Sequence, residues 1–141
     1  MKKTVLILCT GNSARSQMAE ALLRQDAGDR FEVASAGTRP SKVRPEAVEA
    51  MWEIGIDISA QRSKSVDEFA SREFDYVLTV CDDAKESCPV YPGHGNRLHH
   101  SFDDPAAAEG TAEERLQVFR RIRDQLREYL GRFAAHETRK Y

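Results

Sequence analysis

The chain has 141 residues, a hydrophobic fraction of 40% and a formal net charge of −2 at pH 7. A balance so close to neutral excludes a global field that attracts nucleic acid or anionic lipid, so a charged ligand needs a local site. A chain of this size buries enough surface to fold without disulfide staples. We therefore expect residues 1–141 to form a single domain, and we expect a monomer because no feature indicates an obligate oligomer.

The first strand predicted along the chain is Thr4–Leu8, a continuous apolar run that is typical of a strand buried on both faces. A small-residue loop and a helix from about Ser16 follow, and Phe31–Ala36 is a second short strand. A second helix is expected to begin at Pro45 and to end near Gly55. The side chains expected on the buried side of that helix are Val48, Met51, Trp52 and Ile54.

Two more strands, Tyr76–Val80 and Leu98–Phe102, are predicted in the second half. Thr111 and Glu114 form a capping-box pattern that marks the start of the last helix. We expect residues 136–141 to fray. The apolar face of the last helix repeats with a helical period: Leu116, Phe119, Ile122, Leu126, Tyr129, Leu130 and Phe133. The alternation of elements predicts an α/β fold, a short parallel sheet covered by helices on both sides.

The N-terminus carries two lysines before its apolar run, a combination also found in signal peptides. The run Thr4–Leu8 is too short for that role, and residues 11–13 break it. No stretch approaches the roughly 20 apolar residues that cross a bilayer. We therefore expect a cytoplasmic protein that binds neither membrane nor nucleic acid.

The chain has three cysteines, Cys9, Cys81 and Cys88. An odd number in an intracellular chain argues against a structural disulfide framework and favours buried or reactive thiols. Their spacing does not match the usual paired zinc ligands, so we expect no metal. Three histidines, expected in loop and strand positions, add no clear set of partners: His94, His99 and His100.

Reactive side chains follow the predicted strands. Cys9 ends the first strand, Cys81 ends the third, and Asp103-Asp104-Pro105 follows the fourth. Sites in parallel sheets form at the carboxyl ends of the strands, so these features are expected to converge on one edge.

Cys9 and Arg15 bracket a run of small and polar residues between a strand and a helix. Such a loop lets consecutive backbone N–H groups surround a tetrahedral oxyanion, and the helix N-terminus and the arginine fork add positive charge. The same field lowers the pKa of the Cys9 thiol and makes it a nucleophile. The alternative is a buried cysteine and an unrelated surface arginine. The expected oxyanion contacts, besides Arg15, are Thr10, Gly11, Asn12, Ser13, Ala14 and Ser16.

Cys9–Ala21 resembles the active-site signature of the low-molecular-weight protein tyrosine phosphatase superfamily, and Ser35–Thr38 and Asp104-Pro105 also match it. The likeness covers nearly the whole chain. It implies a four-stranded parallel sheet, a phosphate-type loop and a proton-transferring aspartate at Asp104 rather than Asp103.

The block from Cys81 to Pro89 resembles the thioredoxin-coupled arsenate reductases within that superfamily. This resemblance implies reduction of arsenate to arsenite, with phosphate or sulfate as analogues, through a relay of Cys9, Cys81 and Cys88. Thioredoxin then reduces the enzyme by thiol–disulfide exchange, and no cofactor is needed. Such an activity serves arsenic detoxification.

Two other functions remain open. A phosphatase that hydrolyses phosphate monoesters through a cysteinyl-phosphate needs only one cysteine, one arginine and one acid. A redox sensor or oxyanion-binding module is the non-enzymatic alternative. Ala14 stands where phosphatases, and some reductases, carry another cysteine, and its absence leaves the three-cysteine relay intact. Ala106 and Ala107 stand where tyrosine phosphatases show an aromatic residue, which weakens the phosphotyrosine alternative. We expect weak phosphatase activity only as a side reaction of the reductase.

A disulfide between Cys81 and Cys88 sets a geometric condition on the segment between them. Seven residues of helix span roughly 10 Å, whereas a disulfide joins Cα atoms only about 4.4–6.8 Å apart. We therefore expect residues 81–88 to be helical or compact when reduced and looped out when oxidised.

Some members of the family hold potassium beside the loop. Asn12, Glu20 and Ser35 match ligand positions there, whereas the remaining acidic position is Lys64 in this chain. We expect the Lys64 ammonium to replace the ion by pairing with Glu20.

Overall fold

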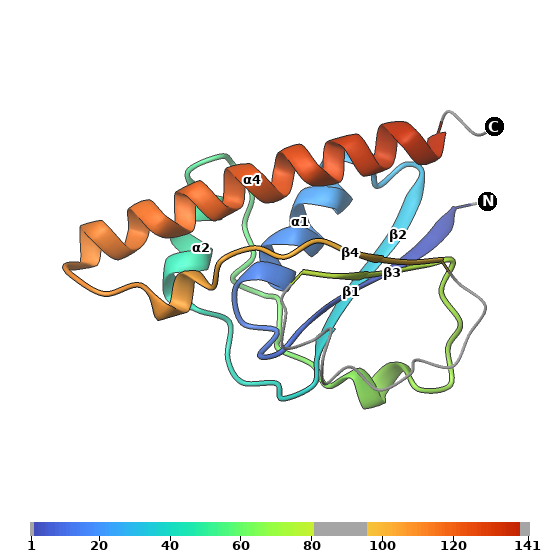
Figure 1. The fold of residues 1–141 in the computed structure, drawn as a ribbon, viewed down its shortest axis with the longest axis horizontal. Coiled ribbons are helices and arrows are strands. Elements are labelled where there is room, and N and C mark those ends of the chain that lie inside the picture. Colours follow the sequence, from blue (N-terminus) through green and yellow to red (C-terminus); the bar gives the residue numbers. More distant parts are fainter. Residues whose placement is uncertain (1, 81–95, 139–141) are drawn as a thin grey trace.

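The computed structural model describes residues 2–80 and 96–138, and these residues form an α/β fold (Figure 1). Four parallel strands lie in the order β2-β1-β3-β4, which confirms the predicted sheet. The strands are β1 (Lys3–Cys9), β2 (Phe31–Gly37), β3 (Tyr76–Thr79) and β4 (Asn96–His99). The helices are α1 (Arg15–Ala27), α2 (Pro45–Trp52) and α4 (Ala112–Thr138), with short 3₁₀ turns η1 (Val66–Phe69) and η2 (Pro105–Ala107).

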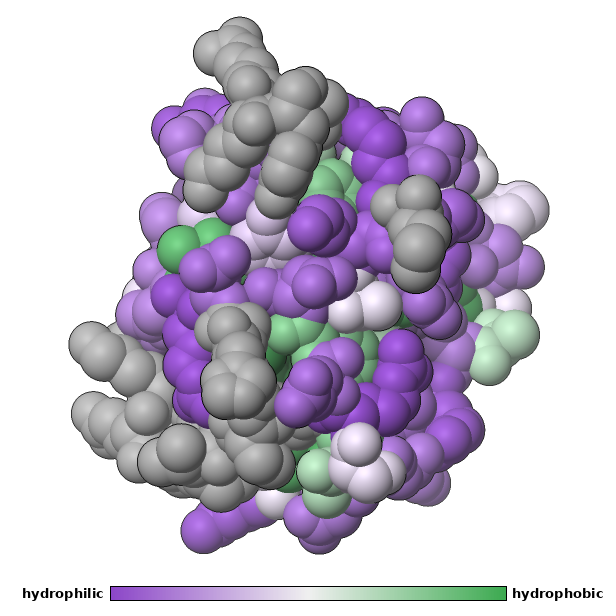
Figure 2. Space-filling model, turned by 90° about the vertical axis from the view of Figure 1, so that its right-hand side faces the viewer, coloured by the Kyte–Doolittle hydropathy of each residue, from purple (hydrophilic) through white to green (hydrophobic). Residues whose placement is uncertain are grey.

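Strand β1 is buried on both faces, as its apolar run predicts. Val5 and Ile7 face a core shared with α1, α2 and α4, while Leu6 and Leu8 join a second cluster that includes Val66 of η1. The three α-helices of the described residues therefore cover one face of the sheet (Figure 1). The prediction of helices on both sides differs from this arrangement, because among the described residues the only helical segment that packs on the other face is the short turn η1. Hydrophilic side chains dominate the surface shown in Figure 2, as expected for side chains that face water.

Helix α4 begins at the predicted capping box. The Glu114 backbone N–H donates to Thr111 Oγ1 at 3.1 Å, and the Thr111 N–H donates to Glu114 Oε1 at 3.2 Å. The predicted apolar face is confirmed: Tyr129 is half-buried, and the other six side chains are buried. Among the described residues, no helix is long and apolar enough to cross a membrane.

The prediction for the second helix is wrong at Trp52, whose exposed fraction is 66%. The helix buries Ala47, Ala50 and Met51, which lie three and four residues apart. Trp52 falls outside this stripe, because the next position of a helix points about 100° away.

The fourth strand begins two residues earlier than predicted. Asn96 and Arg97 pair with β3, and the strand ends at His99. Hydrogen bonds between the two segments continue beyond both strands, since Phe102 N donates to Val80 O. All residues of β4 are exposed, so hydrophobicity marks its start poorly. The helix at the C-terminus also extends further than expected, because residues 136–138 remain helical.

Candidate active site

Cys9 lies at the carboxyl end of β1, buried, with 3% of its surface exposed. The loop from Thr10 to Ala14 connects it to α1. Gly37, its register partner on β2, allows this loop to approach closely. A Cβ at Gly37 would lie 2.5 Å from Thr10 O and 2.9 Å from Asn12 N, so only glycine fits there.

The carbonyl groups of Cys9 and of loop residues 10–13 all accept from residues outside the loop. Four of them accept from backbone amides of the segment after β2, and the Asn12 carbonyl accepts from a side chain. The donors to Cys9, Thr10, Gly11, Asn12 and Ser13 are, in order, Thr38 N at 3.3 Å, Arg39 N at 2.9 Å, Ser41 N at 3.1 Å, Gln17 Nε2 at 3.0 Å and Arg44 N at 2.8 Å.

The amide groups of the loop differ from its carbonyl groups, which all have hydrogen-bond partners. The N–H groups of residues 11–14 donate to no other described residue. Ala14, the N-cap residue of α1, has no side-chain oxygen to cap the helix. Because each peptide unit holds its carbonyl on the outside, its N–H is directed to the opposite side, where it can donate to an anion.

Arg15 and Asp104 come together at the same edge of the sheet. Arg15 Nη1 donates to the Phe102 carbonyl oxygen at 2.9 Å, and Arg15 Nη2 lies 3.7 Å from Asp104 Oδ1. Asp104 caps η2, since its Oδ1 accepts from Ala106 N at 3.0 Å. Asp103 instead pairs with Arg121 at 3.6 Å. The structure thus places Asp104, and not its neighbour, beside the arginine.

Asn12 is the one non-glycine residue with positive φ among the described residues, at 46°. Its Nδ2 donates to Ser16 Oγ at 2.7 Å and to Ser35 Oγ at 2.9 Å. The Ser35 hydroxyl donates in turn to Glu20 Oε1 at 2.8 Å. The residues predicted to support the loop therefore form one buried hydrogen-bond network.

The predicted pairing of Lys64 with Glu20 is present. Lys64 Nζ lies 3.6 Å from Glu20 Oε1, and Glu20 retains 5% of its side-chain surface. A second cation, Arg24 Nη2, lies 3.0 Å from Glu20 Oε2. Sequence reasoning missed Arg24, although its position four residues after Glu20 on a helix was a usable signal. The buried carboxylate is thus compensated at both oxygens.

Gln17 also escaped the sequence analysis. Its side chain is fully buried on the first turn of α1 and donates to the Asn12 carbonyl. Its position on the first turn directly after the loop was the available signal, but position alone does not reveal the hydrogen-bond partner.

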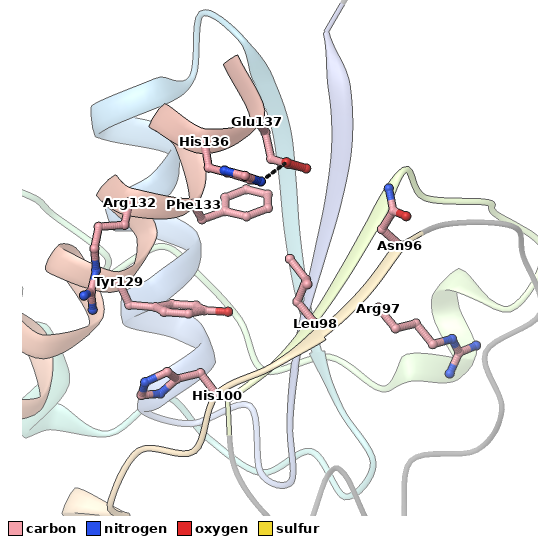
Figure 3. Close-up of a pocket in the computed structure, with 9 residues that line it drawn as sticks. All are labelled: Asn96, Arg97, Leu98, His100, Tyr129, Arg132, Phe133, His136 and Glu137. Atoms are coloured by element: carbon pink, nitrogen blue, oxygen red, sulfur yellow. Dashed lines mark ion pairs between the residues drawn. The ribbon is translucent and has the colours of Figure 1, made fainter. Parts of the chain in front are cut away.

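Two of the three histidines singled out from the sequence have partners outside the loop. His99 Nδ1 and Thr79 Oγ1 are 2.6 Å apart, and the His100 ring packs on Phe102 and Tyr129. His94 lies outside the described residues. A cavity of about 600 Å³ between β4 and the end of α4 contains no predicted site residue (Figure 3). Its lining residues are Asn96, Arg97, Leu98, His100, Tyr129, Arg132, Phe133, His136 and Glu137.

Cys81 and Cys88 lie outside the described residues, as does the segment for which we expect a redox-dependent change of shape. Within residues 2–80 and 96–138, no group of three or more histidine, cysteine, aspartate or glutamate side chains is arranged to hold a metal ion.

The family model of the low molecular weight phosphotyrosine protein phosphatases matches residues 4–140. A protein of Bacillus licheniformis named arsenate reductase is 50% identical over 133 residues, which cover 94% of this chain and 96% of that protein. The solved structure of an arsenate reductase in the oxidised state is 30% identical, with a TM-score of 0.79, and the match covers 95% of this chain and 98% of that one. A thioredoxin-dependent arsenate reductase of Corynebacterium glutamicum is 32% identical, with a TM-score of 0.70, over 96% of this chain and 63% of that one.

Proposed function

The chain belongs to the low molecular weight phosphotyrosine protein phosphatase family, and from this membership and the site we propose that it is an arsenate reductase. We propose that residues 1–141 act as one domain and as a monomer, with thioredoxin as the electron donor. The observation that carries the proposal is the loop after Cys9, whose carbonyls are bonded on the outside while four amides remain for an anion. The relatives named arsenate reductase support arsenate as that anion.

Cys9 begins the reaction. Its thiolate attacks arsenic and forms a sulfur–arsenic bond, and one arsenate oxygen leaves as water after Asp104 supplies a proton. The loop amides and Arg15 stabilise the charge on the remaining oxygens. The position of Asp104 beside Arg15 supports this assignment, since both side chains then face the same anion.

Cys81 completes the reduction. Its thiolate attacks the Cys9 sulfur, so the sulfur–sulfur bond forms as the sulfur–arsenic bond breaks. The electron pair stays on arsenic, which leaves as arsenite. Cys88 then attacks Cys81 and releases Cys9, and the dithiol of thioredoxin reduces the Cys81–Cys88 disulfide. The two electrons therefore come from thioredoxin, and no metal or organic cofactor takes part.

A coupled assay tests this function. With thioredoxin, thioredoxin reductase and NADPH, the parent protein is expected to consume NADPH continuously when arsenate is added. Cys88→Ala is expected to release no more than one arsenite per enzyme, because the Cys9–Cys81 disulfide is trapped. Cys9→Ser is expected to release none.

The phosphatase alternative is decided by the same proteins. An aryl phosphate is expected to be hydrolysed slowly at most, because the loop binds phosphate for the reasons that it binds arsenate. Fast hydrolysis of aryl phosphate together with no turnover of arsenate would overturn the reductase proposal. Continuous arsenate turnover by Cys88→Ala would overturn the relay.

A further inference from the structure

A chain of hydrogen bonds between side chains crosses the base of the loop and ends on the buried carboxylate. Gln61 Nε2 donates to Gln17 Oε1 at 2.7 Å, and Gln17 Nε2 donates to Asn12 Oδ1 at 2.9 Å. Asn12 Nδ2 donates to Ser35 Oγ, whose hydroxyl donates to Glu20 Oε1. Each donor points toward Glu20, so each bond polarises the next in the same sense.

The direction of this chain is fixed by one backbone group. Lys64 N donates to Asn12 Oδ1 at 2.8 Å, and a backbone N–H can only donate. The atom that it meets must therefore be the oxygen of the Asn12 amide. Gln17 approaches the same oxygen, so it must present its own NH₂ group there.

Gln17 holds Asn12 at two points. Its Nε2 lies 2.9 Å from Asn12 Oδ1 and 3.0 Å from the Asn12 backbone oxygen, and a third acceptor, Arg62 O, lies at 2.9 Å. Asn12 is the loop residue in the left-handed conformation, which residues other than glycine seldom adopt.

The Asn12 carbonyl differs from the other carbonyls of the loop. Those of Cys9, Thr10, Gly11 and Ser13 accept from backbone amides, which a side-chain substitution leaves in place. The Asn12 carbonyl accepts from Gln17 Nε2 and from no other described donor. It shares a peptide unit with the Ser13 N–H, so the orientation of that N–H depends on this bond.

We propose that Gln17 is a positioning residue for the oxyanion loop, which acts through Asn12 to keep the Ser13 N–H turned toward the bound anion. Without the Gln17 amide, the peptide unit between Asn12 and Ser13 can rotate, and a carbonyl oxygen then faces the anion in place of a donor. Gln61 supports Gln17 one step further away. This inference rests on the proposed oxyanion site. It concerns a residue that takes no part in the chemical steps of the proposed reaction.

Binding of inorganic phosphate and alkylation of Cys9 test the proposal in a full-length background with Cys81→Ser and Cys88→Ser, where Cys9 is the only thiol. Gln17→Met keeps the side-chain length and removes the amide. We expect it to weaken phosphate binding about tenfold, the equivalent of about one buried hydrogen bond. The pH midpoint of Cys9 alkylation by iodoacetamide is expected to rise, because the thiolate loses a donor.

Gln17→Glu supplies a readout that a purely structural role would not move. At neutral pH its carboxylate faces three carbonyl oxygens without a hydrogen to donate, so this variant should bind phosphate less well than Gln17→Met. In acid the protonated carboxyl offers one O–H donor. The ratio of its phosphate affinity to that of Gln17→Met, measured at each pH, should therefore rise toward acid pH.

Two further variants are compared with Gln17→Met, one expected to have a smaller effect and one expected to have none. Gln61→Met should change both readouts in the same direction as Gln17→Met but less, while Gln117→Met, on the exposed surface of α4, should match the parent. The proposal is overturned if folded Gln17→Met binds phosphate and titrates like the parent. If that variant does not fold, a Gln61→Met protein indistinguishable from the parent overturns it. A parent that binds no phosphate contradicts the proposed oxyanion site, whereas the alkylation profile still tests Gln17.

Discussion

Lys64 Nζ lies 3.6 Å from Glu20 Oε1, and Lys64 stands at the sequence position where the family resemblance has an acidic potassium ligand. Arg24 holds the other oxygen at 3.0 Å. Two fixed cations leave little negative charge at Glu20 to attract a third, so we expect the loop to need no soluble ion.

Replacement of this ammonium should create a requirement for potassium. We expect the arsenate turnover of the parent to be the same in potassium chloride and in choline chloride at equal ionic strength. Lys64→Asp supplies the acidic ligand that the chain lacks, so its turnover should be low in choline chloride and rise severalfold with potassium. Strong activation of the parent by potassium would contradict the role of Lys64.

The two neighbouring aspartates offer a matched pair for the proton-transfer step. Asp104 lies 3.7 Å from Arg15, whereas Asp103 is 85% exposed and pairs with Arg121. Asp104→Asn should lower the single-turnover rate of arsenite formation by about 10²-fold or more, because positioned acids contribute at least that much. Asp103→Asn should change it less than twofold. Equal losses in the two variants would remove Asp104 from the mechanism.

Gly37 and Gly131 test whether the close approach at the loop is required. A Cβ at Gly37 meets Thr10 O at 2.5 Å, while one at Gly131 in α4 meets nothing within 4 Å. Gly37→Ala should therefore lower the unfolding temperature and abolish phosphate binding. Gly131→Ala should raise stability by about 1 kcal/mol, since alanine is the better helix former. Thermal unfolding and phosphate titration of both variants give the answer, and a Gly37→Ala protein that binds phosphate normally would disprove the steric requirement.

Much of the fold could be predicted because local signals and the fold agree. The run around Val5 predicts a doubly buried strand, and Thr111 and Glu114 form the reciprocal cap that their spacing indicates. Trp52 could not be placed, because hydrophobicity alone does not tell which side of a short helix faces the core. The start of β4 at Asn96 depends on pairing with β3 rather than on its own side chains.

Site residues could be predicted from the sequence where the chemistry requires one residue type. They could not be predicted where a residue's role depends only on which atoms it meets after folding. Cys9 and Arg15 were predicted from the loop between a strand and a helix, and Asp104 was predicted from the family resemblance. The structure brings Arg15 and Asp104 together. Gln17 was missed because its role depends on which carbonyl its amide meets after folding. The preference for Asp104 over Asp103 came from the following proline and is supported by the contact with Arg15.

A carboxylate at the end of α2 is held by two arginines of α4, and this cluster, here called the clamp, gives a pH-dependent test of stability. Glu53, just after α2, accepts from Arg120 of α4 at 2.6 Å and from Arg123 at 3.1 Å. The hydrogen bonds from Arg120, followed by the charge of both arginines, hold the pKa of Glu53 below its ordinary value of 4.5. The stabilisation is therefore fully present above that ordinary pKa and is lost as the pH falls through the lowered pKa of the folded protein.

Glu53→Gln should lower the unfolding temperature by about 2–4 °C at pH 7, and the difference from the parent should shrink toward pH 3. Glu128→Gln, which removes an exposed carboxylate that pairs with no described residue, should show neither effect. A difference for Glu53→Gln that stays constant across this pH range would show that the clamp acts through packing rather than charge.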